Sequence, residues 1–318
     1  RIGGLILIAF LALFCAIYIV LKPFVPKQNV STKPCLVRLM GQGVVIGVIA
    51  YFAGLLFWPY ALQDVFSNPL ESLSVMEHYK VSIRQIFNGE MLWSTQLPWY
   101  YLPKWLAIST PEFVFLGLIF YLIFFFKKMF KAFSKQLFFE LFVLFALFFP
   151  LVYVIVIGSN LYSGVRQMLF VLPLLAVLSS IGMYKLIQLK KIQKIRVPLF
   201  LVLIALMLLP FKHQAATFPA DYVYFNSISG GNKNAWSNFE YDYYFHGIKK
   251  SSAFLMELID NKTVTVAVNC NLSNYFTDNE NIRFQYTPYM ERSSTDWDYG
   301  LFGINYVHPV LLKNDTLK

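Results

Sequence analysis

Two long stretches of the chain, residues 2–21 and 39–62, contain no charged side chain. A helix needs about 20 apolar residues to cross the hydrocarbon core of a lipid bilayer, and both stretches are long enough. The second stretch also holds four glycines, which allow helices to approach one another closely. These stretches restrict the chain to a fold that is embedded in a membrane.

Further apolar stretches predict additional spans. The stretch 113–126 is short, but residues 105–108 can extend it across Pro111. Another stretch contains a single charge, Glu140, which we expect to be an ordinary charge at the membrane interface. About six spans are therefore expected. Those not yet named cover residues 137–157, 168–187 and 197–211.

The basic residues are concentrated in three of the connecting loops. Residues 22–38, 127–135 and 185–196 together hold 13 of the 27 basic residues and none of the 17 acidic residues. This is the positive-inside pattern, which places such loops on the cytoplasmic side of the membrane. The long loop at residues 63–110, the short loop at residues 158–167 and the C-terminal tail then lie on the outer side.

The same loops explain the net charge of +10, because they lie where anionic inner-leaflet lipids are found. A strongly basic chain can also indicate nucleic-acid binding. Here the basic residues flank the predicted spans, so we expect no nucleic-acid partner.

Composition divides the chain near Lys212. Charged residues make up only 14% of the chain, against about 25% in a typical soluble domain, and the apolar excess ends there. We therefore predict a transmembrane domain at residues 1–212 and an extracytoplasmic tail domain at residues 213–318. Within the tail, a helix from His246 has Ile248, Leu255, Leu258 and Ile259 on one face, and residues 263–268, 282–286 and 299–307 are strand candidates.

The predicted fold is thus a polytopic α-helical membrane protein with a small C-terminal α/β domain. Its cysteines, Cys15, Cys35 and Cys270, fall in three different compartments, so no internal disulfide is expected. The sequence also has no Cys/His cluster with the spacing of a zinc site, so no metal site is predicted.

The long outer loop is aromatic and amphipathic. Val75, Tyr79, Ile83 and Phe87 follow one another at helical spacing, which predicts a helix over residues 75–87 that lies in the membrane interface. The aromatic residues after it are typical of a belt at the depth of the lipid headgroups. They are Trp93, Trp99, Tyr100, Tyr101 and Trp105.

Arg166 is the strongest single candidate for a binding residue. It is the only charge in the short outer loop, and it lies at the mouth of the predicted fifth span. A guanidinium in that position can bind a phosphate through two parallel hydrogen bonds. The alternatives are that it extends to the lipid headgroups or pairs with an acid such as Asp221. Lys104 could hold the same phosphate, or it could be a headgroup anchor.

The outer acids offer no obvious catalytic pair. Sugar transfer needs a carboxylate that takes the proton of the acceptor. None of these acids has a second carboxylate or a histidine at an informative spacing. Asp242 lies beside two tyrosines, so it could either bind carbohydrate or cap a helix. Glu112 is expected to be an ordinary interface charge.

Three groups of motifs lie on the predicted outer side. The long loop contains Asn68-Pro-Leu, Phe87-Asn-Gly89, Leu97-Pro-Trp-Tyr-Tyr101 and Thr110-Pro111. The fifth span opens with Gly164-Val-Arg-Gln-Met-Leu-Phe-Val-Leu-Pro173. The segment after the last span contains Tyr224-Phe-Asn226, Gly230-Gly231 and Asp242-Tyr-Tyr244.

In this order, the motifs resemble the later part of the GT-C glycosyltransferases of the protein O-mannosyltransferase and aminoarabinose-transferase type, glycosyltransferase family 39. The resemblance covers about residues 68–310. It implies a membrane enzyme, in the inner (plasma) membrane of a bacterium, that takes a sugar from a polyprenyl phosphate. The acceptor would be a glycan, a lipid or a protein. The chain departs from the pattern at Gln167, where this branch often has His, and at Tyr244, where it often has Trp.

The resemblance also implies a mechanism. The family's catalytic aspartate lies in its first outer loop, so we expect it upstream of Arg1, in a longer protein. This chain alone would then be inactive. That aspartate would deprotonate an acceptor hydroxyl, which attacks the anomeric carbon with inversion. Arg166 and Lys104 would hold the departing lipid phosphate. No cofactor is expected, although some relatives use a divalent metal. The expected substrate-binding residues are Trp99, Tyr100, Tyr101, Asn226, Asp242 and Tyr243.

Two other functions are compatible with a membrane chain of this kind. A transporter usually has ionisable residues within its spans, and here they are nearly absent from the span centres. A non-catalytic membrane anchor that presents a sugar-binding or assembly domain is the other alternative. An upstream outer loop with an aspartate would favour the enzyme over both.

Overall fold

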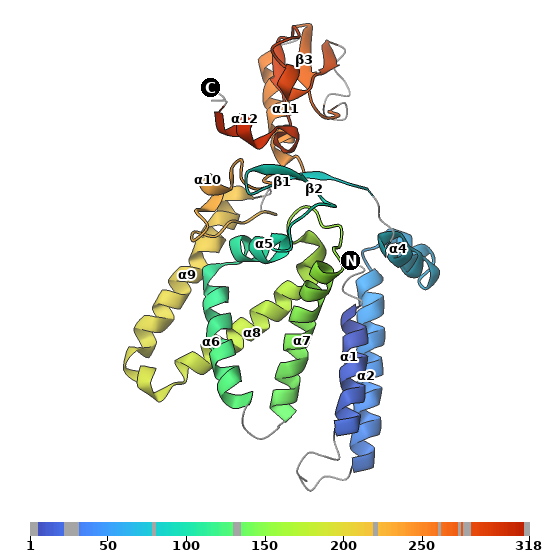
Figure 1. Cartoon of the computed structure of the whole chain (residues 1–318), viewed down its shortest axis with the longest axis vertical. Coiled ribbons are helices and arrows are strands. Elements are labelled where there is room, and N and C mark those ends of the chain that lie inside the picture. The colour runs from blue at the N-terminus through green and yellow to red at the C-terminus, as the bar shows by residue number, and fades with distance from the viewer. Residues whose placement is uncertain are drawn as a thin grey trace. The chain divides into compact units, whose positions relative to one another are not determined.

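The computed structural model describes residues 6–21, 32–77, 81–129, 135–218, 222–259, 262–272, 275 and 281–314. The chain divides into two compact units (Figure 1). Unit 1 comprises Arg1–Val81, Phe113–Asn160 and Val165–Val202. Unit 2 comprises Ser82–Glu112, Leu161–Gly164 and Leu203–Lys318.

Unit 1 begins with two apolar helices, α1 (Ile6–Leu21) and α2 (Thr32–Leu55), which lie side by side (Figure 1). Gly47 of α2 lies at this contact, where an added Cβ atom would be 3.5 Å from Ile8, an ordinary van der Waals distance. Phe10 of α1 packs against Phe145 of α7 (Lys135–Val156), with ring centroids 5.1 Å apart. Two short helices follow, α3 (Pro59–Gln63) and α4 (Ser67–Glu77).

The other helices of the membrane fold are α6 (Glu112–Met129), α7 (Lys135–Val156) and α8 (Leu172–Ile187). A 3-10 turn, η3 (Arg166–Val171), leads into α8, and another, η4 (Lys190–Ile195), leads into α9 (Arg196–Thr217). Helices α6 and α8 approach closely where Gly117 lies against Ser179 and Gly182. Helix α9 extends beyond the predicted stretch 197–211 at both ends.

Within the described residues, three helices are long and apolar enough to cross a membrane: Gln136–Val156, Arg166–Ile187 and Lys190–Thr217. A fourth is obtained if α5 (Tyr101–Ser109) and α6 form one span. These two are bent by 113°, so residues 105–108 do not extend the stretch 113–126 in a straight line. The chain is thus mostly helical with several membrane-length helices, and the prediction of six spans is not confirmed.

Unit 2 contains an antiparallel hairpin of β1 (Arg84–Phe87) and β2 (Glu90–Trp93). The turn residues Asn88 and Gly89 have φ angles of 57° and 78°, which suit the two-residue turns of hairpins. The predicted helix over residues 75–87 is therefore wrong at its C-terminal end: α4 ends at Glu77 and a strand covers Arg84–Phe87. The Asn-Gly turn favours a strand where the spacing of apolar residues predicted a helix.

The tail is a small α/β fold, as predicted. Its parallel sheet has the order β4-β3-β5, with β3 at Val264–Val268, β4 at Ile282–Tyr286 and β5 at Tyr299–Leu301. Helix α11 (His246–Ile259) packs on it through Ile248, Leu255 and Ile259. The prediction was wrong for Leu258, whose side chain is 50% exposed, and the third strand is shorter than residues 299–307.

A second core joins the hairpin to the C-terminal elements of the tail. Ile86 of β1 packs with Tyr289, Val307 and Leu312. These come from η6 (Tyr289–Glu291), from the end of η7 (Ile304–Tyr306) and from α12 (Pro309–Asn314). The hairpin is therefore part of the same folded unit as the tail.

Candidate functional site

Five buried aromatic rings form a cluster beneath the hairpin of unit 2, and we call it the aromatic core. Trp105 on α5 lies at its centre, with ring centroids 5.8 Å from Phe225, 5.6 Å from Phe239 and 6.4 Å from Tyr101. Phe87 of β1 completes it, 4.8 Å from Tyr101. Because Tyr101 and Trp105 of α5 are held in this core, the core also fixes the position of their neighbour Lys104.

Lys104 lies over this core. Its Nζ atom is 5.9 Å from the ring centroid of Phe87 and 5.5 Å from that of Phe239. The negative faces of aromatic rings attract an ammonium group and hold it in place. No carboxylate of the described residues forms an ion pair with Lys104. The lysine is thus a positioned cation that remains half exposed.

Trp99 and Tyr100 form an exposed aromatic edge at the start of α5. The Trp99 side chain is 73% exposed and that of Tyr100 is 38% exposed, and their rings meet edge to face at 5.8 Å. The Tyr100 ring also lies 5.9 Å from that of Phe87, beneath Lys104. The structure therefore brings three predicted residues, Trp99, Tyr100 and Lys104, together on one part of unit 2.

Tyr101, in contrast, is buried and serves as an anchor. Its hydroxyl donates to Gln85 Oε1 at 2.5 Å and accepts the N–H of Gly164 at 3.1 Å. Gln85 in turn donates to the carbonyl of Leu161 at 2.9 Å. These bonds tie the short loop Leu161–Gly164 to the hairpin and to α5, so Tyr101 positions the chain just before Arg166.

Arg166 begins η3 in unit 1, whereas the other predicted site residues belong to unit 2. Ser163 and Gly164, shortly before it, both have positive φ angles, of 55° and 68°. Asp221, the alternative partner of Arg166, lies outside the described residues. That Arg166 and Lys104 hold the same phosphate therefore stays a prediction.

Asn226 is only 2% exposed and uses its amide group within the protein. Its Nδ2 atom donates to the carbonyls of Ala107, at 2.6 Å, and Thr110, at 2.9 Å. Its Oδ1 atom accepts the N–H of Ser229 at 2.9 Å. Asn226 thereby locks the turn after the last span onto the end of α5.

Asp242 caps helix α11, which is one of the two roles that the sequence allowed. Its carboxylate accepts the backbone N–H groups of His246 at 2.9 Å and Gly247 at 2.8 Å, as well as the hydroxyl of Tyr222. The pKa of Tyr222 is raised, chiefly by burial and in second place by its hydrogen bond to Asp242. The Tyr243 ring lies 4.8 Å from that of Tyr222, so Tyr243 belongs to a small aromatic cluster around the cap.

Glu112 has a role that sequence reasoning missed. It accepts the N–H of Ser227, and the hydroxyl of Tyr224 lies 3.5 Å from its Oε2 atom. Burial and the negative charge of Glu112 raise the pKa of Tyr224 to about 12. The residues lie more than a hundred positions apart, and no local pattern indicates such a contact. Glu112 is thus an anchor for the turn at Ser227 and not an ordinary interface charge.

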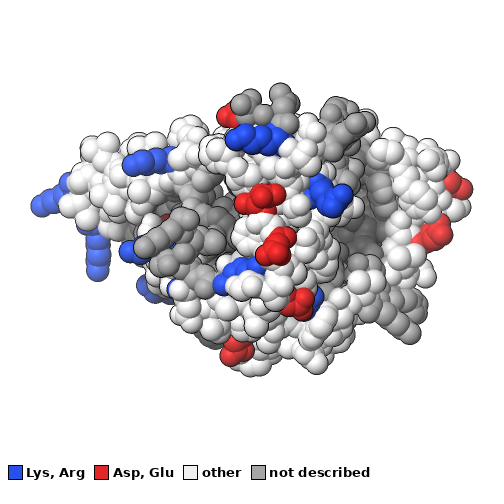
Figure 2. Space-filling view, turned by 90° about the horizontal axis from the view of Figure 1, so that it is seen from above, with Lys and Arg blue, Asp and Glu red and all other residues white. Residues whose placement is uncertain are grey.

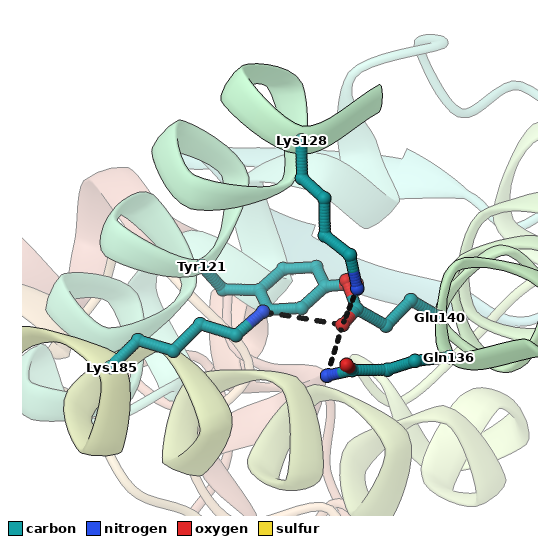
Figure 3. A network of polar contacts seen from close by, with 5 residues as sticks. All are labelled: Tyr121, Lys128, Gln136, Glu140 and Lys185. Carbon is teal, nitrogen blue, oxygen red and sulfur yellow. Dashed lines mark hydrogen bonds and ion pairs between the residues drawn. The ribbon is translucent and has the colours of Figure 1, made fainter. Parts of the chain in front are cut away.

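Glu140 differs from its expected role in the same way (Figure 3). It is 2% exposed, and its Oε1 atom lies 3.2 Å from Lys185 Nζ, 3.6 Å from Lys128 Nζ and 3.1 Å from Gln136 Nε2. The hydroxyl of Tyr121 lies 3.5 Å from Oε2. A buried carboxylate must be paired. Glu140 therefore forms a buried ion cluster among α6, α7 and α8.

Two further features are the distribution of charged side chains on the surface and the arrangement of possible metal ligands. In the middle of the face in Figure 2, acidic and basic side chains are interspersed among uncharged residues. No group of His, Cys, Asp and Glu side chains that could hold a metal ion occurs in the described part of the chain. Comparison with models of protein families, with curated proteins and with solved structures gave no match.

Proposed function

We propose that the chain is part of a membrane glycosyltransferase that moves a sugar from a polyprenyl phosphate to an acceptor on the outer face of the membrane. The observation that carries the proposal is the position of Lys104 over two aromatic rings, beside the exposed rings of Trp99 and Tyr100. A cation and exposed aromatic rings suit a ligand that combines a phosphate with a sugar. The motif order described above supports the same assignment.

The chemistry follows from these groups. In an inverting transfer, the acceptor oxygen bonds to the anomeric carbon while the bond from that carbon to the phosphate oxygen breaks. Negative charge then develops on the departing lipid phosphate. A fixed ammonium close to that oxygen stabilises the charge in the transition state more than in the ground state, which accelerates the reaction. We assign this role to Lys104, and sugar stacking to Trp99 and Tyr100; that Arg166 binds the same phosphate stays a prediction from the sequence.

The sidedness of the membrane is part of the proposal. The distribution of basic residues supports a cytoplasmic location for the lysine-rich loops and an outer location for α5 and the tail. We therefore place transfer on the extracytoplasmic face of a bacterial inner membrane. The membrane-length helices support an integral membrane protein.

Transfer by the full-length protein tests the assignment. The assay follows release of polyprenyl phosphate from a polyprenyl-phosphate sugar in detergent or nanodiscs. Lys104→Ala should lower kcat by roughly 10²-fold, the effect of removing one group that stabilises transition-state charge. Lys249→Ala is the matched control, since Lys249 is exposed on α11. Arg166→Ala should also lower transfer without loss of folding. Equal transfer by all three variants would contradict the proposed site.

A sugar-binding or assembly protein without catalysis is the second candidate. The exposed rings of Trp99 and Tyr100 favour it, because aromatic rings can stack on sugars without any catalytic group. In that case the full-length protein would bind the donor or a glycan, and Trp99→Ala would weaken the binding, but no polyprenyl phosphate would be released. The same assay, run with a binding measurement, separates the two candidates.

A further inference from the structure

The ion cluster around Glu140 carries more positive than negative charge. It joins the carboxylate of Glu140 on α7 to the ammonium groups of Lys128 on α6 and Lys185 on α8. At neutral pH the cluster therefore has one positive charge in excess. Lys128 lies in the last turn of α6 and directly follows Lys127, whose side chain is exposed.

The ammonium groups of the two lysines have few hydrogen-bond acceptors. Lys185 Nζ donates to Glu140 at 3.2 Å and lies 5.3 Å from the ring centroid of Tyr121. Lys128 Nζ lies 3.6 Å from Glu140, beyond hydrogen-bond distance. Among the described residues this buried atom has no hydrogen-bond acceptor. An ammonium has three N–H donors, so the part of the cluster that the structure describes lacks both a second anion and acceptor atoms for Lys128.

We propose that the phosphate of an anionic phospholipid binds at Lys128 and Lys185, at the ends of α6, α7 and α8. The phosphate oxygens supply the missing acceptors and the missing negative charge. Basic pockets between helices at a membrane surface are suited to such headgroups. The side chains of Lys128 and Lys185 are 29% and 23% exposed. Because Lys128 Nζ itself is buried, the flexible side chain of Lys128 must turn outward for a headgroup to reach its ammonium group.

The surroundings favour a lipid over a free phosphate ion. Near Lys128 and Glu140 in the sequence, α6 exposes Ile123 and Phe126, and α7 exposes Phe139, with side chains 42%, 51% and 55% exposed. Acyl chains can cover these apolar side chains while the headgroup contacts the lysines. A free phosphate ion would leave them uncovered.

Lipid retention tests the proposal. The protein is reconstituted in bilayers of equal phosphatidylglycerol and phosphatidylcholine, extracted in detergent and washed at about 1 M salt, where the screening length is about 3 Å. The lipids that remain are quantified by mass spectrometry. Wild type should retain phosphatidylglycerol over phosphatidylcholine. Lys128→Gln should lower retained phosphatidylglycerol by roughly tenfold or more, the effect of losing a charged hydrogen bond.

Matched variants separate this site from general attraction to the surface. Lys127→Gln removes the same charge one residue away, from an exposed side chain, and should change retention by less than about twofold once salt screens it. Lys128→Arg keeps the charge and should restore retention. Lys128→Gln leaves Glu140 paired with Lys185, so the variant should fold, and an unchanged melting temperature checks this.

The direction in which lipid retention changes when Glu140 is replaced distinguishes a lipid site from a structural ion pair. Glu140→Gln leaves two cations, so it should increase retention of phosphatidylglycerol, and its melting temperature should rise when that lipid is added. Three outcomes would overturn the proposal. They are equal loss in Lys127→Gln and Lys128→Gln, lower retention in a folded Glu140→Gln protein, and complete displacement of the lipid by inorganic phosphate.

Discussion

The contact between α6 and α8 leaves no space for a side chain at Gly182. A Cβ atom at this position would lie 2.0 Å from the carbonyl oxygen of Gly117 and 2.6 Å from the backbone nitrogen of Tyr121. Carbon and oxygen atoms normally approach to about 3.3 Å at closest. Because both neighbours are backbone atoms, Gly182→Ala must move the helices apart by roughly 1.3 Å at this point.

The cost of that movement follows from packing. A gap of about 1 Å removes a quarter to a half of the dispersion energy between facing atoms. Overpacking by one carbon costs about 1–3 kcal/mol, and we expect the upper end because no flexible side chain can yield. A loss of about 3 kcal/mol corresponds to a fall in Tm of roughly 6–12 °C, at about 2–4 °C per kcal/mol for a protein of this size.

Thermal unfolding of the purified protein in detergent, followed by size-exclusion chromatography, measures this change. Gly54→Ala is the matched control, since no atom lies within 4 Å of a Cβ placed there. In that variant the higher helix propensity of alanine should leave Tm unchanged or slightly raised. If Gly182→Ala and Gly54→Ala had the same Tm, the close approach of α6 and α8 would be refuted.

Three further predictions concern unit 2, two of them on its anchors and one on a buried thiol. Asp242→Ala removes the cap of α11 at a cost of about 1 kcal/mol, so the amides of His246 and Gly247 should exchange hydrogen roughly fivefold faster. Asn226→Ala leaves two carbonyls without their donor and should lower stability by about 2–4 kcal/mol, whereas Asn238→Ala removes an exposed bond and should cost under about 1 kcal/mol; equal effects would contradict the anchoring role. Burial raises the pKa of the Cys270 thiol, so the folded protein should react slowly with iodoacetamide at pH 8. The stability that this thiol contributes is present below the ordinary thiol pKa and is lost as pH rises through the higher folded value.

The tail was predictable because its signals are local. A β-branched run predicted β3, and the spacing of Ile248, Leu255 and Ile259 predicted the buried face of α11. Asp242 lies four residues before His246, and a carboxylate before a helix is a common cap. These features need only a few neighbouring residues, so the sequence alone carries them.

One error and one bend in the region around α5 have local physical causes. The helical spacing of apolar side chains over residues 75–87 predicted a helix, whereas the dipeptide Asn88-Gly89 is a strong hairpin signal and the chain forms a hairpin there. Thr110 precedes Pro111 and has extended backbone angles of −96° and 134°, as proline imposes on its neighbour. Helix α5 therefore ends there and cannot continue straight into α6.

The charged contacts were not predictable, since they join distant parts of the chain. Glu140 meets Lys185, which is 45 positions away, and Glu112 meets Tyr224, which is 112 positions away. In the sequence each acid is a single charge at the edge of an apolar stretch. Only the packing of the helices decides whether such a charge faces lipid headgroups or a buried partner.

Membrane sidedness is the premise on which the proposed transfer reaction depends. Single cysteines are introduced by Trp99→Cys, Lys249→Cys and Lys127→Cys in a background without Cys15, Cys35 and Cys270. Intact cells are then treated with a membrane-impermeant maleimide. We predict that the cysteines at positions 99 and 249 are labelled, and that the one at position 127 is labelled only after the membrane is permeabilised. Labelling of positions 99 and 249 from opposite faces would contradict the proposed site.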